Sequence, residues 1–251
     1  MKDGALIPHF GRARRDTGLA VLEGFHPLKH ALRFGAEIEL TVTRERAALE
    51  QLAQRLAPDV ATSMLEQVRE VPDDIFGRLA PIPPATGVMA VARRPHVDVP
   101  ALLAASAPAP VVLLENPRDL GNMGACVRVA AAADVAGVLV VEGGHDAWHP
   151  DALRGAAGLH FALPVADIEG GLAGLERTDR PLLALDPDGE ELRPHELDPR
   201  AILAFGTERD GLSDELLQRA DGRVRIPMRE GVSSLNLATS VAATLFAWRL
   251  A

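Results

Sequence analysis

The chain has 251 residues with a formal net charge of −9, and 47% of its residues are hydrophobic and 24% charged. This composition is that of an ordinary globular protein and excludes a disordered or fibrous chain. The length suffices for one large domain or two modest ones. The single cysteine, Cys126, excludes an internal disulfide framework and indicates a reducing compartment, so we expect a cytoplasmic protein.

The two parts of the chain differ in charge. Residues 1–100 hold 13 Lys/Arg and 13 Asp/Glu, whereas residues 101–251 hold 13 and 22. The basic residues of the first part form short clusters, at Arg12, Arg14 and Arg15, at Lys29 and Arg33, at Arg44 and Arg46, and at Arg93 and Arg94. Any one cluster alone reads as solvated surface. Because clustered Lys and Arg supply most nucleic-acid affinity, their concentration favours a nucleic-acid contact in the first part.

The first hundred residues predict a small α/β domain. A strand from near Gly18, a helix over 27–34 and a second strand ending near Glu39 come first. A helix over 47–56 follows, with Leu49, Leu52, Ala53 and Leu56 on one face, and residues 87–92 form a strand. The run 100–110 is rich in Ala and Pro, as linkers are. We therefore predict one domain over residues 1–100 and a second over 107–251.

Strands and helices alternate through the second part. The predicted strands cover 111–114, 138–141, 161–165, 182–185, 201–205 and 224–226, and the predicted helices cover 122–133, 149–157, 168–175, 214–220 and 234–250. This pattern indicates a buried parallel sheet with helices on both faces.

The last helix needs a separate test, because residues 231–248 carry no charge over a length close to that of a membrane span. Six Ser, Thr and Asn residues make this segment too polar to face lipid. We therefore expect no membrane association and a helix that is buried in the protein or at a subunit interface.

Three motifs in the second part carry the chemistry. The first runs from Glu115, which ends a strand, to the helix around Asn122 and Arg128. Gly124 and Arg128 lie four residues apart and share a helix face, so a substrate backbone could approach the guanidinium at the glycine. The alternative is that Asn122 only caps the helix and Arg128 is a surface charge. This motif alone does not decide between them.

The second motif, Gly206 to Ser213, has the spacing of a phosphate loop but lacks its lysine, since Leu212 stands there. Glu208 and Asp210 would repel a polyphosphate, whereas a cationic ligand tolerates them. The alternative is a plain turn in which Ser213 caps the next helix, and both can hold.

The third motif is a strand end at Ile226, Pro227 and Met228, followed by residues 232–236. Here Ser234 could be an ordinary helix cap and Asn236 a polar first-turn residue, or both could direct polar groups into a site.

The order and spacing of these motifs resemble the SpoU/TrmH branch of the SPOUT superfamily. Its members are S-adenosylmethionine-dependent enzymes that methylate the ribose 2′-hydroxyl of tRNA or rRNA. The resemblance implies a carboxyl-terminal trefoil knot, which general topology rules would not suggest, and a homodimer with active sites at the subunit interface. It also implies RNA as the partner and a small ribosomal-protein-like substrate-binding domain at the amino terminus.

The resemblance also assigns roles to residues. It implies catalytic roles for Arg128, Asn122, Glu208, Ser234 and Asn236, and main-chain cofactor contacts by Gly206, Thr207, Ile226, Met228 and Leu235. A guanidinium is a poor proton acceptor, so we expect Arg128 to hold the phosphate and stabilise the developing alkoxide. One departure is Glu230, at a position where the family commonly has glycine.

Two further readings concern a metal and a non-enzymatic role. His145 and His149, with Asp146 and Asp151, lack a third ligand fixed by spacing, so we predict no metal site. The alternative function is a non-catalytic RNA-binding or ribosome-assembly protein that retains the fold.

Overall fold

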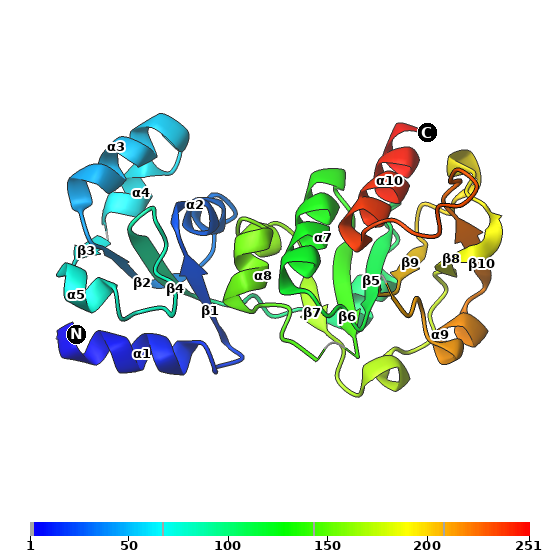
Figure 1. The fold of residues 1–251 in the computed structure, drawn as a ribbon, viewed down its shortest axis with the longest axis horizontal. Helices are drawn as coiled ribbons and strands as arrows, with labels where there is room; N and C mark the ends of the chain where they lie inside the picture. The colour runs from blue at the N-terminus through cyan, green and yellow to red at the C-terminus, as the bar shows by residue number, and fades with distance from the viewer. Residues whose placement is uncertain (1–2, 67, 143, 208) are drawn as a thin grey trace. The chain divides into compact units, whose positions relative to one another are not determined.

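The protein is described by a computed structural model that covers residues 3–66, 68–142, 144–207 and 209–251. The chain divides into two compact units (Figure 1). Unit 1 comprises the chain up to His96 together with Trp148–Ala162, and unit 2 comprises Val97–Ala147 and Leu163–Ala251. The first boundary lies a few residues before the predicted linker, and no sequence pattern predicted that Trp148–Ala162 packs with the first unit.

Unit 1 is built on a four-stranded sheet in the order β1-β4-β2-β3. Its strands are β1 (Leu19–Glu23), β2 (Ile38–Thr43), β3 (Val68–Glu70) and β4 (Val88–Arg93), and only the β2–β3 pair is parallel. Its helices are α1 (Leu6–Ala13), α2 (Phe25–Arg33), α3 (Arg46–Leu56), α4 (Ala61–Glu66), α5 (Asp73–Phe76) and α8 (Pro150–Gly155). Leu6 and Phe10 of α1 pack on Val21, Met89 and Val91 of the sheet. The predicted α/β character of this part is therefore present.

Two close contacts attach the segment Trp148–Ala162 to α2. The ring Nδ1 of His30 lies 2.6 Å from the carbonyl oxygen of Ala157. Gly158 has a φ of +79°, and a Cβ there would stand 2.5 Å from the carbonyl oxygen of Pro27. Only glycine allows both the left-handed backbone and this approach. These contacts join residues more than 120 positions apart, which is why local sequence patterns did not predict them.

Unit 2 contains a six-stranded sheet in the order β10-β8-β9-β5-β6-β7, and every pair is parallel. The strands are β5 (Val111–Glu115), β6 (Gly137–Val141), β7 (Val165–Asp167), β8 (Leu182–Glu191), β9 (Ile202–Phe205) and β10 (Gly222–Arg225). All residues of β5, β6 and β9 are buried, as expected for parallel strands covered on both sides. The predicted α/β class with a parallel sheet is confirmed, and the trefoil knot stays a prediction.

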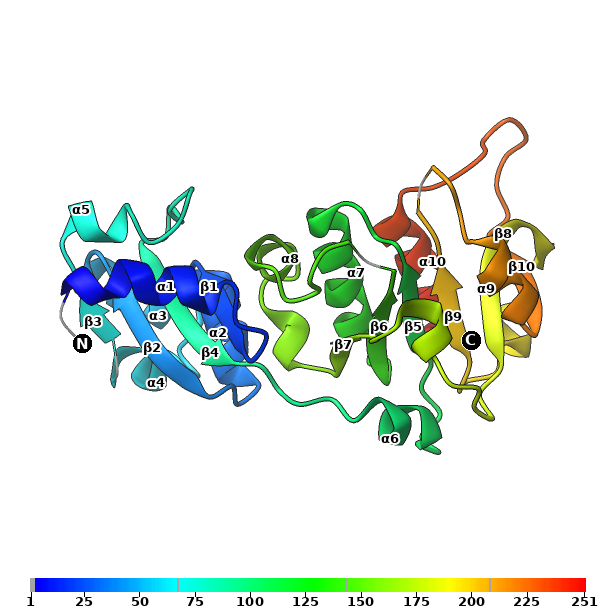
Figure 2. The same ribbon diagram turned by 90° about the horizontal axis from the view of Figure 1, so that it is seen from below.

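Side chains alternate between the two faces of this sheet. One face packs on α6 (Val99–Ala104), a 3-10 turn (Gly171–Gly174) and α9 (Asp214–Arg219), through Leu103, Leu172 and Leu216. The other helices are α7 (Leu120–Ala133) and α10 (Leu237–Leu250), which lie side by side (Figures 1 and 2). Within the described residues, no helix is long and apolar enough to cross a membrane.

Several predicted boundaries shift. The predicted linker contains α6, whose first turn is capped by the Asp98 carboxylate. Helix α7 begins at Leu120 with Asp119 as its cap, not at Asn122. The last helix begins at Leu237 with Asn236 as its cap, not at Ser234. The helix predicted over 168–175 is only the 3-10 turn. Residues 159–161 form another 3-10 turn where a strand was predicted to begin, so β7 starts only at Val165.

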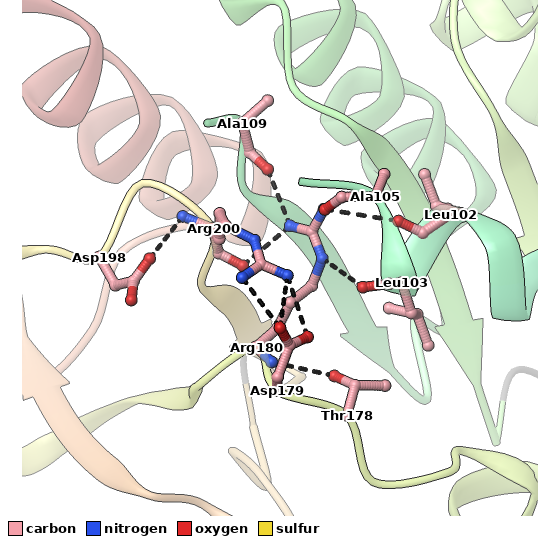
Figure 3. Close-up of polar contacts among 9 residues, drawn as sticks. All are labelled: Leu102, Leu103, Ala105, Ala109, Thr178, Asp179, Arg180, Asp198 and Arg200. Carbon is pink, nitrogen blue, oxygen red and sulfur yellow. Dashed lines mark hydrogen bonds and ion pairs between the residues drawn. The ribbon is translucent and has the colours of Figure 1, made fainter. Parts of the chain in front are cut away.

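Arg180 fixes the end of the sheet where β5, β8 and β9 begin (Figure 3). Its side chain is 3% exposed, and burial lowers the pKa of the guanidinium, as does the nearby Arg200. It donates hydrogen bonds of 2.8 to 3.4 Å to the carbonyl oxygens of Leu102, Leu103, Ala105, Ala109 and Arg200. These acceptors include the last carbonyls of α6, which the helix itself leaves unpaired. The segment between α6 and β5 is thereby held on unit 2.

Candidate active site

A pocket of about 610 Å³ opens in unit 2, beyond the carboxyl ends of β9 and β10. The second and third sequence motifs form much of its wall. All five predicted cofactor contacts line it, together with Ser234. The volume and the mixture of apolar and polar lining are typical of a small-molecule site.

The first wall is the loop that follows β9. Thr207 and Gly211 exchange two main-chain hydrogen bonds of 3.1 Å each, and the Thr207 hydroxyl accepts the amide of Asp210 at 3.0 Å. A Cβ on Gly206 would lie 2.1 Å from the main chain of Gly211. Glycine is therefore required at position 206, because the two main-chain segments meet there without room for a side chain.

The second wall is the irregular segment from Ile226 to Asn236. Ile226, Met228 and Leu235 are half-buried and line the pocket. Within the described residues, no hydrogen bond engages their main-chain groups. These groups are available to a ligand, as the resemblance implied. Gly231 adopts a φ of +84°, so the glycine of this loop stands one residue beyond Glu230.

A third part of the pocket was not predicted. Leu185, Asp186, Pro187 and Asp188 belong to β8 and also line the pocket. The pairing of β8 with β10 skips from Ala184 to Glu190, so these residues bulge out of the ladder. A Pro-Asp-Gly sequence within an apolar strand is the signal that could have revealed this bulge.

The charges around the pocket have both signs. Acidic side chains come from Asp186, Asp188, Asp210 and Asp214, and basic ones from Arg209, Arg223 and Arg225. Asp186 pairs with Arg223 at 3.5 Å, and Asp210 pairs with Arg118 at 2.8 Å. Asp188 and Asp214 make no ion pair within the described residues, so their carboxylates stay available to a cationic ligand.

The predicted catalytic residues fall into two groups. The Asn236 amide donates to the Asn122 side-chain oxygen at 3.1 Å, which joins α7 to the start of α10, and the Asn236 oxygen also caps α10. Arg128 lies further along α7 and is exposed, and its side chain has no hydrogen bond or ion pair within the described residues. It does not line the pocket as formed by the described residues of one chain.

Three predictions about these residues need comment. Gly124 is buried, so the single chain offers no open approach for a substrate beside it. Ser234 caps no helix, since Asn236 does, and it faces the pocket instead. Glu208 lies outside the described residues.

A metal site is not evident. Within the residues that the structure describes, no group of three or more His, Cys, Asp or Glu side chains is arranged to hold an ion. His149 instead caps α8, with its Nδ1 accepting the amide of Asp151 at 3.1 Å.

Comparison with known proteins identifies the family. The model of the SpoU rRNA Methylase family matches residues 109–246. An uncharacterized tRNA/rRNA methyltransferase of Mycobacterium bovis is 31% identical over 218 residues, which cover 78% of this chain and 75% of that protein. A 23S rRNA (uridine(2479)-2'-O)-methyltransferase of Streptomyces viridochromogenes is 26% identical over 250 residues, covering 93% and 83%.

A solved structure agrees with the fold. The SpoU methyltransferase AviRb from Streptomyces viridochromogenes, in complex with AdoMet, superposes with a TM-score of 0.73 at 24% identity, covering 99% of this chain and 95% of that one. The match extends across both units. The chain belongs to the SpoU rRNA methylase family.

Proposed function

We propose that this protein is an RNA methyltransferase that transfers a methyl group from S-adenosylmethionine to a ribose 2′-hydroxyl of rRNA or tRNA. The observation that carries this proposal is the pocket in which all five predicted cofactor contacts meet. Relatives named as 23S rRNA 2′-O-methyltransferases favour ribosomal RNA as the substrate class.

The pocket suits the proposed cofactor. Its apolar side chains can cover an adenine ring, and the free main-chain groups of Ile226, Met228 and Leu235 can hydrogen-bond the ring edge and the ribose. Its carboxylates suit a ligand with a sulfonium and an ammonium group. When bound, S-adenosylmethionine supplies an electrophilic methyl group, so the chemistry needs no metal.

The protein's own residues then position the nucleophile. We assign Arg128 to the ribose-phosphate of the RNA, where a guanidinium can bind the phosphate bidentately and stabilise negative charge on the attacking oxygen. Asn122 and Asn236 form a hydrogen-bonded pair that fixes α7 against α10, and Ser234 presents its hydroxyl at the pocket. We include Glu208 on the resemblance alone.

A homodimer would bring these groups together. Phe246 and Leu250 on α10 are 39% and 84% exposed, and Val232 before the helix is 48% exposed. Apolar side chains on a terminal helix suit a subunit interface. Because Arg128 lies outside the pocket of its own chain, we propose that a second subunit completes the site. Unit 1, with its exposed Arg12 and Arg15, would bind the RNA, and the protein would act in the cytoplasm.

Two experiments test the proposed function. Calorimetry with S-adenosylmethionine, in the presence of a chelator, should show binding, and no heat of binding would contradict the proposed cofactor. Mapping ribose methylations in total RNA with and without the gene should reveal a missing site. Cofactor binding without any missing methylation would favour the non-catalytic RNA-binding alternative.

A further inference from the structure

Glu115 is a buried carboxylate that the proposed mechanism does not use. It is the last residue of β5 and is 5% exposed. A buried carboxylate is costly unless hydrogen bonds satisfy it. Both of its oxygens accept from one residue, Ser213, whose amide donates to Oε2 at 2.7 Å and whose hydroxyl donates to Oε1 at 2.6 Å.

Ser213 ends the loop that forms the first wall of the pocket. Gly211 and Leu212 before it and Asp214 after it line the pocket, whereas Ser213 itself faces Glu115. The Ser213 hydroxyl also accepts the amide of Leu216 at 3.2 Å and so caps α9. One side chain therefore fixes both the end of the loop and the start of the next helix.

Glu115 also lies just before α7 in the chain. Leu114 of β5 pairs with Phe205 of β9. Glu115 is the next residue on β5 and Gly206 is the next residue after β9, so both stand at the same edge of the sheet. Four residues separate Glu115 from α7, which carries Asn122 and Arg128. A second contact, the ion pair between Arg118 and Asp210, joins the same two loops, but both side chains are more than 60% exposed and it contributes little.

We propose that Glu115 is a positioning residue: through Ser213 it holds residues 209–213 of the pocket wall in the shape that receives the cofactor, in a fixed position relative to α7. The proposal rests on the proposed function for the identity of that ligand. Glu115 does not line the pocket and contacts no reacting atom, so it acts only through Ser213. Hydrogen bonds to a charged, buried acceptor are the strong ones, which makes this pair a suitable anchor.

The test compares Glu115→Gln, Ser213→Ala and the double variant in the full chain. Calorimetry with S-adenosylmethionine should show about a tenfold loss of affinity for each single variant, equivalent to ~1.4 kcal/mol. The double variant should lose less affinity than the two single losses combined, because the hydrogen bond between the Ser213 hydroxyl and Glu115 is weakened in both single variants. The single-turnover rate at saturating cofactor should stay within about threefold. Ser213→Thr, which keeps the hydroxyl, should retain most of the affinity.

Asp98→Ala is the matched control, because Asp98 caps α6 in the same way, through the amide of Ala101 at 2.9 Å, away from the pocket. It should lower stability without changing cofactor affinity. Wild-type affinity in Glu115→Gln, or losses that add in the double variant, would overturn the proposal. Ser213 is exposed, so its variants should fold even if Glu115→Gln does not. In that case the affinities of Ser213→Ala and Ser213→Thr test the proposal, because only the threonine keeps the hydroxyl.

Amide hydrogen exchange without ligand separates this inference from the proposed function. Release of the loop in Glu115→Gln should speed exchange at the Ser213 amide, whichever ligand the pocket takes. If wild-type protein binds no S-adenosylmethionine, the proposed function fails, and unchanged exchange at Ser213 would independently sink the anchoring role.

Discussion

Two buried charges stand at opposite ends of strand β5, and their partners differ in kind. At the end where the strands begin, every hydrogen bond of the Arg180 guanidinium within the described residues goes to a main-chain carbonyl, in or next to α6, before β5 or before β9 (Figure 3). At the end where β5 stops, Glu115 accepts from a single residue of a pocket loop. Arg180 thus secures the scaffold, and Glu115 adjoins the parts that handle ligands.

This difference separates stability, at one end of the sheet, from ligand binding, at the other. Two of these carbonyls belong to α6 and the others lie in the segments next to α6, β5 and β9, so a cation that binds all of them ties these elements together at the amino-terminal end of the sheet. A loop held by one carboxylate and one hydroxyl can be released at moderate cost. Substitutions at the first end should therefore change stability, and those at the second should change binding or transfer.

The largest effect is expected for Arg180→Ala. The substitution leaves several buried carbonyls without a donor, and each such group costs about 1–3 kcal/mol. We expect the free energy of unfolding of unit 2 to fall by about 4 kcal/mol. Hydrogen exchange of the β5 amides during urea denaturation would follow unit 2 separately, because the two units need not unfold together.

Arg200→Ala is the control for removal of a neighbouring arginine. Arg200 pairs with Asp179 at 2.9 Å, but the Asp179 side chain is 69% exposed, so we expect a loss below about 1 kcal/mol. Arg180→Lys should recover only part of the loss, because an ammonium group cannot reach the acceptors that the planar guanidinium joins. Equal stability of Arg180→Ala and Arg200→Ala would contradict the scaffold role.

Arg128→Ala should have the opposite profile. Arg128 is exposed and contributes nothing to the described pocket wall, so stability and cofactor affinity should stay near wild type. Loss of electrostatic support for the attacking oxygen should slow transfer about a hundredfold, or ~3 kcal/mol. Single-turnover methylation of RNA at saturating cofactor measures this. Wild-type transfer by the alanine variant would make Arg128 the surface charge of the alternative interpretation.

Gly206→Ala tests the pocket wall itself. A methyl group would stand 2.1 Å from the main chain of Gly211, so the loop must move. We expect S-adenosylmethionine affinity to fall about thirtyfold, or ~2 kcal/mol. Gly11→Ala, in α1 with no atom within 4 Å of the added carbon, is the matched glycine control and should leave affinity unchanged. Unaltered cofactor binding by Gly206→Ala would show that the ligand site lies elsewhere.

The sequence predicted the parallel sheet because its strands are continuous apolar runs between helical periodicities. It did not predict that Trp148–Ala162 packs with unit 1, since that depends on contacts to Pro27 and His30 that no local pattern encodes. The cap of α7 is Asp119, three residues before Asn122, and the cap of α10 is Asn236, two residues after Ser234. Several polar residues precede each of these helices, so the sequence alone does not decide which one caps.

The pocket shows the same limit. Gly206 and Ile226 could be placed in it because the motifs have fixed spacing along the chain. Asp186 and Asp188 were missed, because the bulge that brings them there arises from the pairing of β8 with β10. Glu115 was seen only as a strand end, since its partner Ser213 is 98 residues away.

The smallest expected effect is a pH dependence in unit 1, where neither buried charge of unit 2 takes part. Burial lowers the pKa of His30, and the nearby Lys29, Arg33 and His26 lower it further, while the Ala157 carbonyl opposes this.

The pKa of His30 in the folded chain lies below its value in the unfolded chain, so the unfolded chain binds more protons at pH values between the two. The stability contribution is therefore complete above about pH 6.5 and is lost as pH falls through the folded pKa. His30→Asn keeps a donor for the Ala157 carbonyl but cannot titrate. The stability of this variant should therefore depend less on pH between about 7.5 and 5, the range in which an imidazole titrates. Urea unfolding of unit 1 at several pH values measures the slope. An identical slope in both proteins would contradict this prediction, because His30 would then have the same pKa in the folded and the unfolded chain.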